Sequence, residues 1–273
     1  MKIIRVWFTF FLLLFFSCKI YSQVSDTIPT HDSIIFFSKQ LKENRKINIW
    51  LPKQYKNSKA SFEVVYMLDG GIKEDFPHLA NTISELINQH KIKPIILVGI
   101  ENTQRRRDLT GFTVNEKDKE IAPVVGGSEA FRAFIKNELF EEINKRYRTK
   151  DTKTIIGESL AGLFITETFL LYPAMFSNYI AFDPSLWWNN EYLVKEADNF
   201  LNKFTNQPKN FWFAASGVQG IYKPTNELAS IFKNKHLSNF NYKYSFEPKE
   251  DHSTIFKATK EKALIWMLGS THK

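Results

Sequence analysis

From about residue 60 onward, short apolar runs alternate along the chain with longer amphipathic segments. The short runs are rich in Ile, Val, Phe and Tyr and have the length of strands, whereas the longer segments repeat apolar positions at helical spacing. Together with one earlier run, the predicted strands lie at residues 47–51, 62–68, 94–100, 152–157, 179–183, 210–215 and 242–247. The predicted helices lie at residues 76–90, 128–146, 159–172, 191–204, 225–235 and 254–268. This alternation predicts an α/β fold, with a mostly parallel central sheet and helices on both of its faces.

Two segments support this architecture. Residues 94–100 (PIILVGI) are apolar at consecutive positions, as expected of a strand that is buried on both faces. Residues 160–171 are apolar nearly all round, as expected of a helix packed against the middle of such a sheet.

The composition is that of a chain that folds around a full core. Over 273 residues it is 43% hydrophobic and 15% aromatic, which excludes a disordered chain, a fibre and a disulfide-stabilised mini-protein. Gly and Pro together make up 21 residues and no low-complexity run occurs, so no long flexible linker divides the chain. We predict a single domain over residues 23–273.

The first 22 residues have the pattern of a signal peptide. Lys2 and Arg5 precede an apolar run of 11 residues at 6–16, which is too short to cross a bilayer comfortably, and Ser22 is a small residue at the expected cleavage point. Cys18 stands in a context that loosely resembles a lipoprotein box, so a lipid anchor is an alternative, as is an uncleaved membrane anchor. We therefore expect export to the periplasm or the exterior, with membrane attachment only through lipidated Cys18.

Net charge and cysteine content exclude several classes of function. Without the basic residues of the leader the net charge falls from +8 to +5, and the densest basic run, at 105–107, is followed at once by Asp108. Nucleic-acid surfaces usually need an extended basic stripe, so we expect no nucleic-acid partner. Residues 23–273 contain no cysteine, which excludes disulfides, thiolate catalysis and cysteine zinc sites there.

The stretch 154–163 (TIIGESLAGL) carries the clearest chemical signal. It predicts a strand, a sharp turn bearing Ser159, and a buried helix, with the small residues Gly157 and Ala161 two positions away on either side. A nucleophile elbow needs small residues at these places because larger ones would collide with the strand and the helix. In such a turn the Leu160 amide can face an oxyanion. The alternative is a serine that merely caps the helix.

A serine nucleophile needs a base, which in this kind of fold follows the last strand. His252 lies five residues beyond the last predicted strand and just before the final helix. The other histidines lie near the chain ends or near helices. The six are His31, His78, His90, His236, His252 and His272.

Several further landmarks occur in a characteristic order. They are 65–71 (VYMLDGG), 98–102 (VGIEN), 107–110 (RDLT), 157–163 (GESLAGL), 184–188 (PSLWW) and 251–253 (DHS). With these landmarks, residues 47–266 resemble the "putative esterase" family of α/β-hydrolases, which includes enterobactin-type siderophore esterases, feruloyl esterases and S-formylglutathione hydrolases. The siderophore-esterase-like members fit best.

The resemblance implies a serine carboxylic-ester hydrolase that acts through an acyl-enzyme without a metal or organic cofactor. Ser159 is then the nucleophile, His252 the general base, and Gly70 or Gly71 the second oxyanion donor beside Leu160. The substrate would be a small-molecule or polysaccharide-linked ester, of the siderophore or aromatic (feruloyl) type. The rival hypotheses are a non-catalytic module that binds a carbohydrate or a partner, and acyl transfer to a sugar instead of water.

Three further roles stay open at this point. Many family members carry a Glu after the seventh strand, where this chain has Gln219, so Asp183 ranks first as the triad acid, followed by Glu227 and by a dyad without an acid. Arg107 lines the substrate mouth, or it pairs with Asp108 and holds the loop. Trp187 floors an aryl or acyl pocket, or it is a core anchor.

Overall fold

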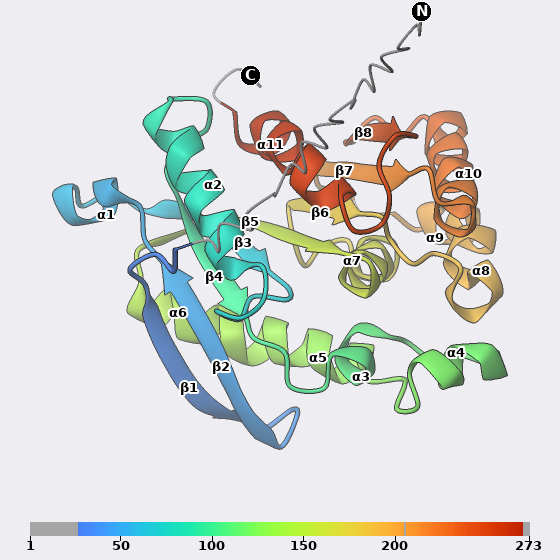
Figure 1. Cartoon of the computed structure of the whole chain (residues 1–273), viewed down its shortest axis with the longest axis horizontal. Coiled ribbons are helices and arrows are strands. Elements are labelled where there is room, and N and C mark those ends of the chain that lie inside the picture. The colour runs from blue at the N-terminus through green and yellow to red at the C-terminus, as the bar shows by residue number, and fades with distance from the viewer. Residues whose placement is uncertain (1–26, 205, 270–273) are drawn as a thin grey trace, which may run out of the picture.

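One mixed sheet forms the centre of the molecule in a computed structural model, which describes residues 27–204 and 206–269 (Figure 1). Its eight strands lie in the order β1-β2-β4-β3-β5-β6-β7-β8; β1 and β2 pair antiparallel to their neighbours, and all other pairs are parallel. The strands are β1 (Asp32–Ser38), β2 (Glu43–Trp50), β3 (Phe62–Met67), β4 (Ile95–Ile100), β5 (Thr149–Glu158), β6 (Asn178–Phe182), β7 (Lys209–Ser216) and β8 (Phe240–Glu247). The carboxyl ends of β3 to β8 therefore share one edge of the sheet.

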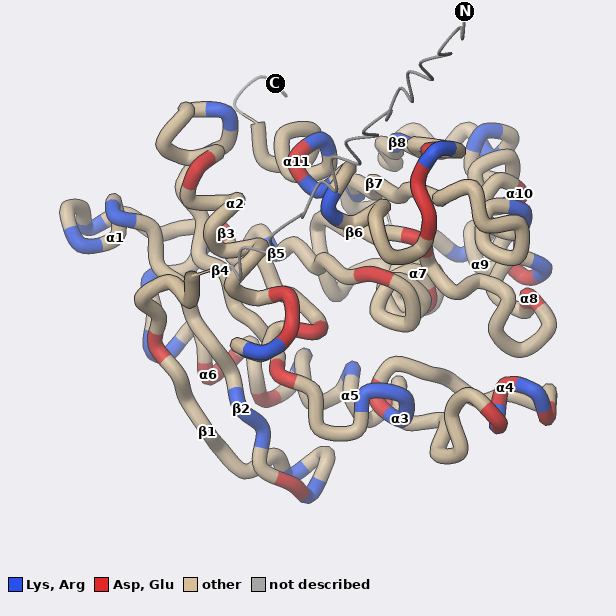
Figure 2. Tube along the Cα trace, in the orientation of Figure 1, with Lys and Arg blue, Asp and Glu red and all other residues tan. Residues whose placement is uncertain are grey.

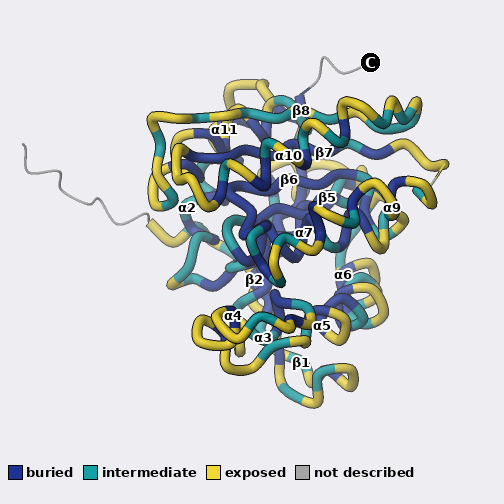
Figure 3. Tube along the Cα trace, turned by 90° about the vertical axis from the view of Figure 1, so that its right-hand side faces the viewer, coloured by how far each residue is buried: buried dark blue, intermediate teal, exposed yellow. Residues whose placement is uncertain are grey.

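Helices cover both faces of this sheet, and each face has its own apolar core. The cluster on one face includes residues of α5 to α10, and the cluster on the other includes residues of α2 and α11. In Figure 3 the buried residues are concentrated in the central strands. The helices are α1 (Lys53–Asn57), α2 (Phe76–Asn88), α3 (Arg105–Leu109), α4 (Glu116–Ile121), α5 (Ser128–Phe134), α6 (Phe140–Arg146), α7 (Leu160–Leu171), α8 (Trp188–Lys195), α9 (Ala197–Leu201), α10 (Gln219–Lys235) and α11 (Ile255–Leu268), with a π-helical turn (Ile135–Leu139) between α5 and α6.

The expected fold class is confirmed, and each of the seven predicted strands is present. The β1 edge strand was not predicted, because the run of four apolar residues at 34–37 hides its alternation: Ile35 and Phe37 are exposed, whereas Ile34 and Phe36 are half-buried. The helix expected at 191–204 is divided into α8 and α9. The helix expected at 225–235 begins earlier, at Gln219, because α10 accommodates Pro224 in its interior.

Helix α7 occupies the position that its composition predicts. It follows β5 directly, packs mainly on β5 and β6, and buries ten of its twelve residues. This placement brings the start of α7 to the carboxyl edge of the sheet, which is where parallel α/β sheets bind their ligands.

The expected signal peptide at 1–22, with Cys18, lies outside the described residues. Within residues 27–204 and 206–269, no helix is long and apolar enough to cross a membrane. Basic and acidic residues are interspersed along the trace in Figure 2.

Candidate active site

The turn between β5 and α7 holds Ser159 in a conformation that L-residues rarely adopt. Its φ is 62° and its ψ is −120°, outside the helical and extended regions, and such strain persists only where the surroundings enforce it. Here the Ser159 amide donates to the Phe182 carbonyl at 2.9 Å, and the Ser159 carbonyl accepts from the amides of Leu163 at 2.9 Å and Ser185 at 3.2 Å. The serine is therefore fixed at the start of the helix with its side chain at the carboxyl edge of the sheet.

The small residues of the elbow are required by close packing. A Cβ on Gly157 would lie 2.6 Å from the Ala161 Cβ, and a Cβ on Gly162 would lie 2.9 Å from the Pro184 Cα. Real Cβ atoms do not approach so closely, so a larger residue at either position would push the elbow out of place. The sequence argument from residue size at 157 and 161 thus has a direct geometric basis.

Strand register brings an acid to the same edge. Glu158 pairs with Phe182 across β5 and β6, and Phe182 pairs with Ala214 across β6 and β7. Ser159 and Asp183 each follow one of these paired positions, so both leave the sheet at neighbouring points. Like Ser159, Asp183 has a positive φ (43°), which marks a sharp turn at the end of β6.

The structure brings Ser159, His252 and Asp183 into one hydrogen-bonded chain. His252 Nε2 lies 3.0 Å from Ser159 Oγ, and His252 Nδ1 lies 2.8 Å from Asp183 Oδ2. An ionised carboxylate can only accept, so the Nδ1 proton points at Asp183 and Nε2 is left to accept the serine proton. This is the arrangement that a serine nucleophile and its general base need.

Asp183 is fully buried and strongly held. In addition to His252, its carboxylate accepts from the Ser216 amide at 2.6 Å and from the Ser216 hydroxyl at 2.8 Å. Of the acids left open by the sequence, Asp183 rather than Glu227 occupies the position against His252. Ser216 was not foreseen; the signal that could have found it is a polar residue at the end of β7, next to the strand that carries the acid.

The hydrogen bond that His252 donates to Asp183 raises the pKa of His252 above its usual value, against the opposing effect of partial burial. The negative charges of Asp183 and Glu158 raise this pKa further, whereas Arg105 lowers it. The paired carboxylate therefore makes His252 a stronger base than a free imidazole.

The expected oxyanion donors need a correction. Leu160 is the first residue of α7, so its amide has no acceptor within the helix and stays available. The Gly70 amide, however, donates to the Ile100 carbonyl at 2.9 Å, and the Gly71 amide donates to Glu74 Oε2 at 2.6 Å. The close approach of Gly70 to the backbone of β4 fixes the first bond, so Gly70 is excluded as a donor, and Gly71 could act only after Glu74 moves away.

Arg107 also lies differently from the expectation that it lines the substrate mouth. Its guanidinium bonds Glu43 at 2.7 Å and Asp108 at 2.6 Å, and Asp108 in turn pairs with the buried Arg45 at 2.7 Å. Arg107 therefore ties α3 to β2, in agreement with the alternative of a loop-holding pair.

Arg105 is the arginine beside the nucleophile, and the sequence pointed to it only as part of the basic run at 105–107. Its guanidinium makes two hydrogen bonds to Asp69, at 2.6 and 2.8 Å, and a long one of 3.5 Å to the carbonyl of Glu158. Asn102 donates to Asp69 and to Glu74. The four residues Arg105, Asp69, Asn102 and Glu74 thus form one hydrogen-bonded polar rim.

Glu158, the residue before the nucleophile, is an acid with a raised pKa beside this rim. Burial is the main cause that raises its pKa to about 7, and the negative charges of Asp75, Asp183 and Asp69 raise it further, whereas His252 opposes them. Its Oε1 atom is buried without a hydrogen-bond partner. At neutral pH Glu158 is therefore divided between its charged and neutral forms.

The two tryptophans after β6 have different surroundings. Trp187 is half-buried and packs against the core on the α7 face of the sheet, as in the core-anchor alternative. Trp188 is buried, and its indole donates to the Gly111 carbonyl at 3.3 Å. Across residues 27–204 and 206–269, no three His, Cys, Asp or Glu side chains gather as a metal site.

Comparison with known proteins gives a consistent result. The sequence profile of the family described as "Putative esterase" matches residues 38–231. The ferri-bacillibactin esterase BesA of Bacillus subtilis is 31% identical over 220 residues, which is 72% of this chain and 73% of that protein.

Solved structures show the same fold. An IroE-like serine hydrolase from Shewanella oneidensis has a TM-score of 0.79 and 25% identity, covering 87% of this chain and 79% of that one. The BES protein from Bacillus cereus has a TM-score of 0.78 and 22% identity, covering 89% and 98%. The profile match, the identity with BesA and the shared fold agree, and the chain accordingly belongs to this esterase family of α/β-hydrolases and is a serine carboxylic-ester hydrolase.

Proposed function

We propose that this protein is an exported esterase that hydrolyses the ester bonds of a siderophore through an acyl-enzyme on Ser159. The observation that carries the substrate class is the 31% identity with the ferri-bacillibactin esterase over 72% of the chain. The hydrogen-bonded chain of Ser159, His252 and Asp183 supports the mechanism.

In this mechanism His252 Nε2 takes the proton of Ser159 as the oxygen attacks the ester carbonyl. The imidazolium that forms is stabilised by the buried charge of Asp183, 2.8 Å from Nδ1. The Leu160 amide holds the oxyanion, an interaction whose loss typically costs about 3 kcal/mol. His252 then protonates the departing alcohol, and the same histidine activates the water that releases the acid from Ser159.

The second oxyanion donor is proposed to be the Gly71 amide, after Glu74 has turned away. The neutral form of Glu74 favours this movement, because an uncharged carboxyl holds the amide less strongly. Burial raises the pKa of Glu74, against the hydrogen bonds from Gly71 and Asn102 that lower it. Substrate entry at this edge would therefore complete the oxyanion hole.

Export is part of the proposal because the pattern of residues 1–22 is that of a signal peptide. Fractionation of cells that produce the full chain, with and without Cys18→Ala, tests it. Release of the wild-type protein supports cleavage, membrane association that Cys18→Ala abolishes supports lipidation, and cytoplasmic retention contradicts export.

The test of the substrate is hydrolysis of a ferric siderophore trilactone, followed by chromatography and mass spectrometry of the products. We expect linear fragments that are absent with Ser159→Ala. Transfer of the acyl group to an added sugar, instead of to water, would contradict hydrolysis. Rapid cleavage of simple esters without any trilactone cleavage would contradict the siderophore.

A further inference from the structure

The loop that carries His252, residues 248–254, lies mostly at the surface, although the base on it must stay aligned with Ser159. The His252 side chain itself is 43% exposed. Apart from the bonds of His252, this loop makes a single hydrogen bond, within the described ranges, to a segment other than the adjoining β8 and α11. That bond runs from the Gly217 amide to the Glu250 carbonyl, at 3.0 Å. The position of the base therefore depends on the end of β7.

The end of β7 also holds the acid. The preceding residue, Ser216, donates its amide to Asp183 Oδ1 at 2.6 Å and its hydroxyl to Asp183 Oδ2 at 2.8 Å. His252 Nδ1 lies 2.8 Å from the same Oδ2 atom, so the serine and the histidine share one oxygen of the carboxylate. Ser216 and Asp183 are fully buried, which shields these bonds from bulk water. Two consecutive residues thus support the acid and the loop of the base.

The order of the strands explains why one point of the chain reaches both groups. Strand β7 lies between β6, which leads to the acid, and β8, which leads to the loop of the base. The register places Ala214 of β7 opposite Phe182, the last residue of β6. It places Ser216 opposite Glu247, the last residue of β8. The residues at the carboxyl end of β7 therefore stand between the acid and the loop.

Close packing requires the glycine at position 217. A Cβ on Gly217 would lie 2.6 Å from the Pro248 carbonyl oxygen, a separation that real Cβ atoms do not show. Only glycine lets the chain approach the loop closely enough to bond the Glu250 carbonyl. Gly220, three residues further on, provides a contrast, because a Cβ there would meet nothing within 4 Å.

We propose that Ser216 and Gly217 form a positioning pair, which fixes Asp183 and the loop of His252 at the separation that aligns the base with Ser159. Both residues act through the groups that they hold, not on the substrate. The inference rests on the proposed acyl-enzyme mechanism at Ser159 but not on the siderophore as the substrate, so a simple ester serves for its test.

The first variant, Gly217→Ala, adds one methyl group that pushes against Pro248 and moves the loop of His252. Because a displacement of about 1 Å at a catalytic group costs about 100-fold in rate, kcat for methyl butanoate should fall by about that factor, with KM within about threefold. Gly220→Ala makes the same chemical change without a collision and should leave both constants unchanged. Hydrolysis is followed by pH-stat titration, and equal activity of the two variants would overturn the proposal.

The second variant, Ser216→Ala, has a consequence that a loosened structure does not produce. Without the hydroxyl, Asp183 Oδ2 keeps more of its negative charge for His252, so the pKa of the imidazole should rise and the acid limb of kcat/KM should move up by about 0.5 pH unit. The other charged groups that act on this imidazole, Glu158 from β5 and Arg105 from α3, are unchanged. A loosened bond to Asp183 would lower the pKa instead, so an acid limb that stays in place or moves to lower pH would overturn the role of the hydroxyl.

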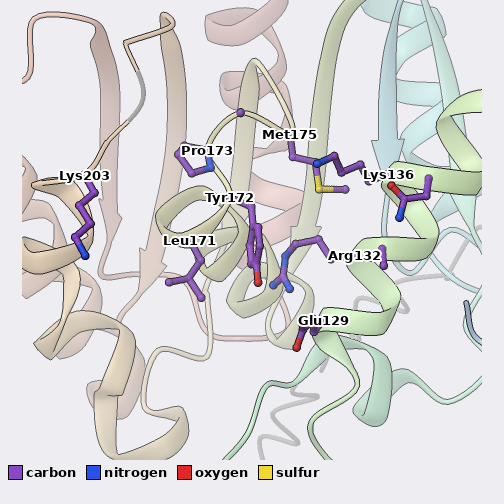
Figure 4. A pocket seen from close by; sticks show the side chains of 11 residues that line it. Glu129, Arg132, Lys136, Leu171, Tyr172, Pro173, Met175 and Lys203 are labelled. Carbon is purple, nitrogen blue, oxygen red and sulfur yellow. The ribbon is translucent and has the colours of Figure 1, made fainter.

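Two controls separate positioning from general destabilisation. Ser38 is also fully buried and donates to a carboxylate, that of Glu138 at 2.5 Å, but it lies on β1. Tyr172 packs against the Arg132 guanidinium beside a cavity of about 620 Å³ at the far end of α7, about 18 Å from Ser159 along the helix (Figure 4). Ser38→Ala and Tyr172→Ala should lower the free energy of unfolding and keep the kcat and acid limb of the wild type. The losses of the test variants, if they appeared in either control, would overturn the proposal.

The proton on His252 Nδ1 gives a readout that does not depend on turnover. Because it is held against Asp183, it should give a far-downfield signal in the proton NMR spectrum of the wild type. We expect this signal to be lost in Gly217→Ala and kept in Gly220→Ala, with both proteins folded by thermal unfolding; the same signal in both variants would overturn the positioning pair. If Gly217→Ala does not fold, the acid limb of Ser216→Ala decides. If the signal behaves as expected but no siderophore is hydrolysed, the proposed function fails while the positioning pair stands.

Discussion

Replacing Asp183 by Asn tests the electrostatic part of the site, because it keeps the shape of the side chain and removes the charge. In the structure, the Asp183 carboxylate accepts three hydrogen bonds, two from Ser216 and one from His252 Nδ1. An asparagine can still accept from the Ser216 amide with one oxygen. Its NH₂ group, however, then faces His252 and donates to Nδ1, which moves the imidazole proton to Nε2.

This tautomer is the wrong one for catalysis. His252 Nε2 lies 3.0 Å from Ser159 Oγ, and a protonated Nε2 would donate to the serine oxygen instead of accepting its proton. The same change in other serine triads lowers kcat by about 10⁴-fold, which corresponds to about 5 kcal/mol in the activation free energy. We expect a loss of this size in Asp183→Asn.

The pH profile gives a second readout of the same change. The pKa of His252 is raised above its usual value of about 6.5, first by the hydrogen bond to Asp183. Only neutral His252 acts as a base, so kcat/KM should fall as the pH falls through a value above about 6.5. Without the charge of Asp183 this pKa drops, and the acid limb of the residual activity should shift to lower pH.

The assay is steady-state hydrolysis of one ester between about pH 5 and 9, with thermal unfolding of each variant as a check on folding. Asp151→Asn makes the same chemical change at an exposed position of β5 and should leave activity and the pH profile unchanged. A folded Asp183→Asn protein that keeps more than about a tenth of the activity, with its acid limb unmoved, would refute the role of Asp183.

Three further changes test the packing and the charges around the site. Gly157→Ala should destabilise the fold by about 1–3 kcal/mol and lower activity, because the added Cβ would lie 2.6 Å from that of Ala161. In urea unfolding, the double variant with Ala161→Gly should recover part of the lost stability, whereas additive losses would contradict the clash. Asp108→Ala leaves the buried Arg45 with fewer partners, so the free energy of unfolding should fall by about 3 kcal/mol. A fall of less than about 1 kcal/mol would contradict the importance of this ion pair. Glu158→Gln removes a negative charge that raises the pKa of His252, so the acid limb of kcat/KM should move to lower pH; a limb that stays in place or moves upward would contradict the coupling.

Residue types and their order along the chain were enough to predict the main architecture. Consecutive apolar residues in β4 and the uniformly apolar α7 require burial on both sides, and only a covered parallel sheet provides it. The elbow could be predicted for a similar reason, because the sizes of residues 157 and 161 report on a close packing contact. Asp183 could be ranked first since it ends a strand next to the nucleophile.

Other features depend on atoms that sequence patterns do not place. The amides of Gly70 and Gly71 looked available, but their hydrogen bonds to Ile100 and Glu74 are set by the path of the loop against β4. Arg105 and Arg107 lie two residues apart and point to different partners because α3 turns between them. The direction of a side chain after a sharp turn is decided by tertiary packing, which one sequence does not reveal.

The central claim is that Ser159 forms a covalent intermediate, and intact-mass analysis after treatment with a fluorophosphonate tests it most directly. The matched control is Ser185→Ala, because Ser185 Oγ is the neighbouring hydroxyl, 3.5 Å from Ser159 Oγ. We predict one adduct in the wild type and in Ser185→Ala, mapped by peptide sequencing to Ser159, and none in Ser159→Ala. An adduct that persists in Ser159→Ala, or that maps to Ser185, would contradict the account.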